Sequence, residues 1–200
     1  MPPLLILAHG AGAGSGHPFM VRIRRELEAR GVRVVTFDFP YIRAHRRVPD
    51  KAPVLEAAWR EQIDAVKRDA ALASLPLFIG GKSMGGRMAS NVAAQGVPGL
   101  SGLVFLGYPL HPPGKPERRR DAHLPSIKEP MLFVQGERDE FGSQAEIREL
   151  LPRLGRASLH VVPGGDHSLK VRGAAASQDE VFAGVADTVT SWMKGLTSTR

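Results

Sequence analysis

Residues 78–90 read FIGGKSMGGRMAS, and this stretch decides the fold. Two patterns overlap in it. Gly81-Lys82-Ser83 resembles the end of a phosphate-binding loop. The pentapeptide from Gly81 to Gly85 instead fits G-x-S-x-G, in which a serine occupies a sharp turn between a strand and a helix. The first pattern predicts nucleotide binding, and the second predicts a nucleophilic Ser83.

The residues around these patterns argue against nucleotide binding. A phosphate-binding loop needs a glycine five positions before Gly81, because a long glycine-rich arc must wrap the phosphates, but Pro76 stands there. The run HGAGAGSG at 9–16, followed by a predicted helix and by Asp38, resembles a dinucleotide site. Its third glycine is out of register and falls on Ser15 or His17. A dinucleotide-binding protein therefore remains a less favoured alternative.

The rest of the chain alternates between short apolar runs and amphipathic segments. The runs are nearly unbroken in hydrophobicity, as expected of parallel strands covered on both faces; they lie at 3–8, 32–37, 76–80, 102–107, 130–134 and 157–162. Helical stripes begin near Pro18, Leu55 and Met84, and Ser177 with Glu180 predicts a capping box for a last helix. We expect an α/β fold with a six-stranded, mostly parallel sheet, helices on both faces, and one domain over residues 1–200.

Composition narrows the class of protein. The 200 residues are 42% hydrophobic and 24% charged, which is typical of a globular protein, and they include no cysteine. No apolar run approaches the length of a membrane span. The net charge is +7, but no long basic run or aromatic-basic alternation indicates nucleic acid binding. We expect a cytoplasmic protein, a monomer or homodimer, without a membrane or nucleic acid partner.

A nucleophilic serine needs a base and an orienting carboxylate, which in this order of elements follow at the ends of later strands. Asp139 comes after the run at 130–134, and His167 comes after the run at 157–162. Their neighbours have ordinary explanations as surface charges, a packed strand residue or a turn cap; these are Glu137, Glu140, His160 and Asp166. The sequence therefore predicts a Ser83–Asp139–His167 triad, and Lys82 is then only the variable residue of G-x-S-x-G.

An acyl-transfer site also needs backbone donors for the oxyanion and a place for the substrate. We expect the N–H groups of Ala11 and Met84 to supply the oxyanion hole. Further residues in the loops at this edge of the sheet are predicted to contact the substrate: Gly10, His17, Tyr41, Tyr108 and His111. Basic residues in or beside these loops predict either a solvated rim or a preference for an anionic substrate: Arg43, Arg46, Arg47, Lys82, Arg87 and Arg118 to Arg120.

Four segments in this order, LLILAHGAGAG, GGKSMGGR, QGERDEFG and GGDHSLKV, resemble the alpha/beta-hydrolase superfamily, in its dienelactone-hydrolase-like branch. More narrowly they are similar to a family of predicted bacterial hydrolases, testis-expressed hydrolase-like proteins and a subunit of the NSL chromatin complex. The resemblance implies a minimal fold that begins at the third strand of full-length members and has no cap domain. It also implies that the loop at 109–125 occupies the usual place of a lid. Ser83 stands where dienelactone hydrolases proper carry cysteine.

The sequence thus predicts a serine hydrolase that cleaves a small carboxylic ester or thioester through an acyl-enzyme on Ser83. This chemistry requires no metal and no cofactor. The alternative from another class is a non-catalytic interaction module that keeps the hydrolase fold, since the chromatin-associated member resembles a scaffold.

Overall fold

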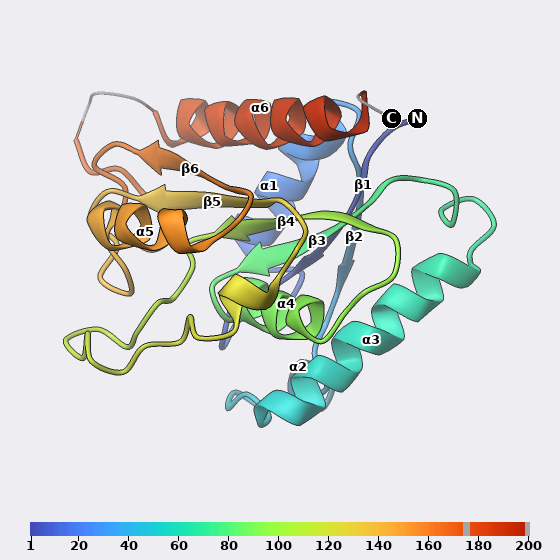
Figure 1. Cartoon of the computed structure of the whole chain (residues 1–200), viewed down its shortest axis with the longest axis horizontal. Helices are drawn as coiled ribbons and strands as arrows, with labels where there is room; N and C mark the ends of the chain where they lie inside the picture. The colour runs from blue at the N-terminus through green and yellow to red at the C-terminus, as the bar shows by residue number, and fades with distance from the viewer. Residues whose placement is uncertain (174–176, 199–200) are drawn as a thin grey trace.

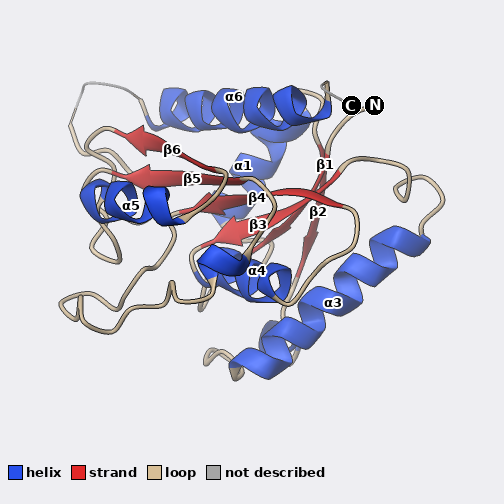
Figure 2. Cartoon of the chain, in the orientation of Figure 1, coloured by secondary structure: helices blue, strands red, loops and turns tan. Residues whose placement is uncertain are grey.

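A single six-stranded sheet organises the chain. The computed structural model describes residues 1–173 and 177–198. All neighbouring strands are parallel, in the order β2-β1-β3-β4-β5-β6 (Figure 2). The strands are β1 (Leu4–Ala8), β2 (Arg33–Phe37), β3 (Leu77–Lys82), β4 (Leu100–Leu106), β5 (Met131–Gly136) and β6 (Ala157–Val162). The six predicted strands are confirmed, with ends that shift by up to two residues.

Helices cover both faces of this sheet (Figure 1). Helices α1 (Pro18–Glu28) and α6 (Gln178–Thr197) bury apolar side chains on one face, together with Leu5, Leu7 and Val104. Helices α3 (Ala52–Arg68), α4 (Met84–Ala94) and α5 (Gln144–Leu150) cover the other face. Each apolar stripe follows the helical repeat, so burying it against the sheet removes a continuous surface from water. The predicted capping box at Ser177 and Glu180 is present.

Several short elements did not appear in the sequence-based prediction. These are α2 (Pro40–Arg43), α5, and the 3-10 turns η1 (Leu124–Ser126) and η2 (Leu151–Arg153). Helix α5 has only seven residues, too few for a periodic stripe. Its capping box was readable, because Ser143 caps the N–H of Glu146 and the Glu146 carboxylate accepts from Ser143.

The parallel strands bring four loops to one edge of the sheet. The loops after β1, β3, β5 and β6 meet there, beside the long β4–β5 connection at 107–130. Within the described residues that connection holds η1 and no inserted cap domain. Because both apolar layers pack on the same sheet, we propose that the chain is a single domain. None of the described helices has the length and apolarity needed to cross a bilayer.

Candidate active site

Ser83 lies on a strained turn between β3 and α4. Its φ is 50° and its ψ is −118°, a backbone conformation that costs a non-glycine residue about 1–3 kcal/mol. The turn is fixed on both sides, since the N–H of Ser83 donates to Leu106 O and the N–H of Arg87 donates to Ser83 O. The glycines are required by close approach: a Cβ on Gly85 would lie 2.5 Å from His9 O. The strained turn points to function, because the fold alone gives no reason to hold a serine there.

The structure brings the three predicted triad residues together. His167 Nε2 lies 2.8 Å from Ser83 Oγ, and His167 Nδ1 lies 2.8 Å from Asp139 Oδ2. Because a carboxylate can only accept, Nδ1 carries the proton and Nε2 is left to accept from the Ser83 hydroxyl. Asp139 is buried and His167 is partly exposed. This arrangement can draw a proton from Ser83 toward an imidazole that a buried carboxylate orients.

Two residues that sequence reasoning missed hold Asp139 and His167 in place. Gln135, buried at the end of β5, donates from Nε2 to Asp139 Oδ2 over 2.8 Å. The Phe141 N–H donates to Asp139 Oδ1, and the Phe141 ring stacks on His167 with ring centroids 4.1 Å apart. A polar Gln135 ending an otherwise apolar strand was the available signal. The stacking of Phe141 had no signal in the sequence, because it depends on where the loop after β6 places His167.

The predicted oxyanion donors lie beside Ser83. Ala11 and Met84 border a cavity that also contains Ser83, and in the described part of the chain neither N–H has a protein acceptor. Tyr41 Oη accepts from the N–H of Gly12. His9, which sequence reasoning did not single out, is buried; it donates from Nδ1 to Gly10 O, and its Nε2 accepts from the N–H of Phe39. Burial lowers the pKa of His9, so the neutral ring that can make both bonds is favoured.

Lys82 has a defined position that the sequence did not predict. Its side chain is buried, and Nζ donates to His167 O, which ties the turn at Ser83 to the loop that carries the base. Desolvation lowers the pKa of Lys82 to about 8, against the opposing attraction of Asp139 and Asp166. The interpretation of Lys82 as only a variable residue is therefore wrong. At a position that any residue could occupy, the side chain would be expected in solvent, whereas the Lys82 ammonium is buried and hydrogen-bonded.

Two cavities flank Ser83, and both are bordered by Ala11, Ser83 and Phe141. The first, of about 270 Å³, is called here the arginine cavity and also includes Met84, Arg87 and Arg120. The second, of about 290 Å³, is called the histidine cavity and also includes Phe19, Met20, Lys82 and His167. Each is large enough for a small organic group. Ser83 thus stands where the two halves of a substrate could meet.

The predicted substrate contacts divide into two groups. Gly10 and His17 border the histidine cavity. Tyr41, Tyr108 and His111 border neither cavity, and a substrate contact by these three stays a prediction.

Their polar atoms are engaged inside the protein. Tyr41 Oη lies between Gly10 O and Gly12 N, Tyr108 Oη donates to Arg120 O, and the ring nitrogens of His111 face Pro112 O and Glu146 Oε1. Burial raises the pKa of Tyr108. These residues shape the loops around the cavities. In sequence, a polar aromatic residue after a strand looks the same whether it shapes a loop or contacts a substrate.

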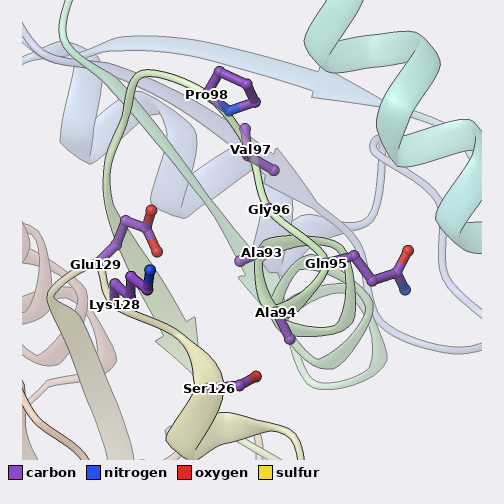
Figure 3. A pocket seen from close by; sticks show the side chains of 9 residues that line it. All are labelled: Ala93, Ala94, Gln95, Gly96, Val97, Pro98, Ser126, Lys128 and Glu129. Carbon is purple, nitrogen blue, oxygen red and sulfur yellow. The ribbon is translucent and has the colours of Figure 1, made fainter.

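A larger hollow lies at the opposite edge of the sheet. This distal hollow, of about 560 Å³, is formed where α4 ends and where η1 leads into β5; its lining includes Gln95, Val97, Ser126, Lys128 and Glu129 (Figure 3). None of the triad residues borders it. Among the described residues, no three His, Asp or Glu side chains gather as a potential metal site, here or elsewhere.

The comparisons with known proteins agree on one fold. A family model described as an alpha/beta hydrolase domain matches residues 2–194. Est1E from Butyrivibrio proteoclasticus, solved with ferulic acid bound, superposes with a TM-score of 0.77 at 16% identity, over 98% of this chain and 90% of that one. A dienelactone hydrolase from Anabaena variabilis gives 0.75 at 19% identity, over 97% and 86%. A monoacylglycerol lipase from Paleococcus ferrophilus gives 0.71 at 16% identity, over 95% and 96%.

Proposed function

The chain belongs to the alpha/beta hydrolase family, and from that premise we propose that it is a serine hydrolase that cleaves a carboxylic ester or thioester. The observation that carries the proposal is the continuous chain of short contacts from Ser83 Oγ through His167 to the buried carboxylate of Asp139. The strained turn at Ser83 adds to it, because strain of this kind persists where function requires it. The solved relatives named as a dienelactone hydrolase and a monoacylglycerol lipase make esters the class to test first.

In the first half-reaction Ser83 Oγ attacks the carbonyl carbon while its proton passes to His167 Nε2. The carbonyl oxygen takes the negative charge and accepts from the N–H groups of Ala11 and Met84. When the tetrahedral species collapses, the bond to the leaving oxygen or sulfur breaks and His167 returns its proton to that atom. The products of this step are an alcohol or thiol and an acyl group on Ser83.

In the second half-reaction water replaces the alcohol. His167 Nε2 takes a proton from the water as its oxygen attacks the acyl carbon, and the same proton then restores the hydroxyl of Ser83. The net change is ester plus water to acid plus alcohol. Asp139 keeps the imidazole in one tautomer and stabilises its positive charge in both halves. The chain's own side chains and backbone therefore account for every proton.

A non-catalytic interaction module is the second candidate that the family resemblance raises. A scaffold needs the fold but has no use for a strained serine, an aligned imidazole and a carboxylate held by Gln135 and Phe141. The complete set of catalytic contacts therefore favours the hydrolase.

Steady-state hydrolysis of short-chain 4-nitrophenyl esters tests the proposal. We expect turnover by the wild-type protein and a fall in kcat/KM of at least about a thousandfold in Ser83→Ala. The matched control is Ser126→Ala, which removes a hydroxyl from the distal hollow and should hydrolyse esters at the wild-type rate. A folded wild-type protein without turnover of ester or thioester would contradict the proposal, as would a Ser83→Ala protein of equal activity.

A further inference from the structure

The arginine cavity contains two cations on the same side of Ser83. Arg87 comes from α4, four residues after Ser83 and hence on the same side of the helix. Arg120 comes from the β4–β5 connection, and both residues border the cavity together with Ser83 and Met84. Two arginines from separate elements thus border a space that a substrate of Ser83 would occupy.

No acidic side chain contacts this pair among the described residues, although Glu56 attracts Arg87 from beyond ion-pair distance. Among the described residues neither Arg87 nor Arg120 forms an ion pair, whereas Arg119 pairs with Asp121 in the same connection. Arg87 Nε is buried without a hydrogen-bond partner in the described part of the chain. Desolvation, and then repulsion by Arg120, lowers the pKa of Arg87. A partly buried guanidinium beside a second one is costly unless an anion joins them.

Asp50 is the acidic residue that borders the arginine cavity. One of its oxygens accepts from Arg46 over 2.7 Å, and the other has no protein partner among the described residues. Because the charge of Asp50 is balanced by Arg46, Asp50 does not cancel the positive charge of Arg87 and Arg120. The cavity therefore keeps an excess of positive charge.

A buried polar network forms hydrogen bonds to the backbone carbonyls of both arginines. The Ser90 hydroxyl donates to Arg87 O, and the Tyr108 hydroxyl donates to Arg120 O over 3.0 Å. His123 Nε2 lies 2.7 Å from Ser90 Oγ, and the two hydroxyls are 3.4 Å apart. This bracing fixes where the two side chains start, as a site for a specific anion requires and as a solvated basic rim does not.

The place of His167 assigns the two cavities to the two halves of an ester. His167 delivers a proton to the leaving group, so the leaving group belongs in the cavity that His167 borders, and the acyl group belongs in the other. Building on the proposed serine hydrolase activity, we propose that Arg87 and Arg120 bind a carboxylate at the far end of the acyl group. The preferred substrate is then a monoester or thioester of a short dicarboxylic acid.

The volume of the arginine cavity limits the length of this acyl group. A water molecule takes roughly 30 Å³ in the liquid, so about 270 Å³ holds on the order of nine such groups. A four- or five-carbon diacid fits within this volume. Monoethyl glutarate is therefore a suitable probe, with ethyl 5-methylhexanoate as its neutral match because an isopropyl group replaces the carboxylate.

The test is the ratio of kcat/KM for monoethyl glutarate to that for ethyl 5-methylhexanoate, measured by titration of the released acid. We expect the wild-type ratio to exceed ten, and Arg87→Gln and Arg120→Gln each to lower it about tenfold, because each removes a charged hydrogen bond. Arg118→Gln removes the same charge from an exposed position of the same connection and should keep the wild-type ratio. A wild-type ratio near one, or an equal loss in Arg118→Gln, would overturn the proposal.

A second pair of esters tests the assignment of the cavities. In 4-acetoxybutanoate the carboxylate lies on the alcohol part, and 4-methylpentyl acetate is its neutral match. We expect the wild-type protein to show less preference for the anion in this pair than in the glutarate pair. A larger preference here would overturn the placement of the carboxylate on the acyl group.

Binding of glutarate separates this proposal from the proposed activity. Calorimetry on the Ser83→Ala protein needs no turnover, so it reports on the arginine pair even if no ester is hydrolysed. We expect binding that weakens about tenfold in Ser83→Ala combined with Arg120→Gln, but not with Arg118→Gln. Absence of binding would overturn the subsite while leaving ester hydrolysis intact. Binding without hydrolysis of any ester would support the subsite and contradict the hydrolase.

Discussion

The two edges of the sheet contain hollows of opposite character. The carboxyl edge has two cavities of about 270 and 290 Å³, and the amino edge has the distal hollow of about 560 Å³. Only the smaller pair adjoins a strained backbone, a buried lysine and a buried carboxylate. The distal hollow is formed by the end of a helix and by two charged residues, the exposed Lys128 and the partly buried Glu129. The volume of a hollow therefore does not locate the site. Its location is indicated by features that cost free energy of folding, namely the strained backbone, the buried lysine and the buried carboxylate.

The largest effect that separates the two edges should come from His167→Ala. Without the base, Ser83 is an ordinary hydroxyl, and we expect kcat/KM for a short-chain ester to fall about 10,000-fold. His160→Ala is the matched control, because His160 lies on edge strand β6 and borders neither cavity at Ser83. Comparable activities in the two variants would remove His167 from the chemistry.

A smaller effect should come from Lys82→Met, compared with Lys128→Met in the distal hollow. Lys82 ties His167 O to the turn at Ser83, so its loss should misplace the base and lower kcat by about ten- to a hundredfold, with little change in KM. Lys128→Met should leave kcat unchanged, because the Lys128 side chain is exposed at the amino edge. Equal kcat values for wild type and Lys82→Met would show that the tie has no role.

The same pair of variants gives a pH signature. The pKa of Lys82 falls from 10.5 in the unfolded chain to about 8 in the fold. Between these values only the unfolded state keeps the proton, so the free energy of unfolding should rise with pH by up to about 1.4 kcal/mol per unit. The measurements should end near pH 10. Above that pH the raised pKa values of Tyr41 and Tyr108 make the free energy of unfolding fall with pH, which opposes the effect of Lys82. The slope should vanish in Lys82→Met and persist in Lys128→Met.

The smallest effect concerns the loop with the oxyanion donors. Burial lowers the pKa of His9, so below its ordinary value of 6.5 the unfolded state takes up a proton that the folded state resists. Stability should therefore fall as pH drops from 6.5 to 5.5, and His9→Gln should reduce this slope. His123 and His160 contribute in the same direction, so part of the slope remains. His45→Asn, at an exposed position, should keep the wild-type slope; a His9→Gln slope equal to wild type would contradict the account of His9.

The sequence predicted what depends on local pattern. Unbroken apolar runs gave the six strands, and the order of Ser83, Asp139 and His167 after successive strands placed them at one edge. The roles of Lys82 and Tyr108 were not predictable in this way. Burial of Lys82 depends on the loop after β6, where His167 O accepts from its Nζ. Tyr108 turns inward, where its hydroxyl donates to Arg120 O and lies beside the Ser90 hydroxyl. Such contacts join segments far apart in the chain, and no local pattern encodes them.

The most direct test of the central claim is covalent labelling with a fluorophosphonate probe, followed by mass spectrometry of the labelled peptide. The probe reacts with a serine only when a base activates it, so it reports on the nucleophile without a choice of substrate. We predict labelling of the wild-type protein at Ser83, equal labelling of Ser126→Ala, and none of Ser83→Ala. A correctly folded wild-type protein that stays unlabelled, or that is labelled on another residue, would contradict the assignment of Ser83.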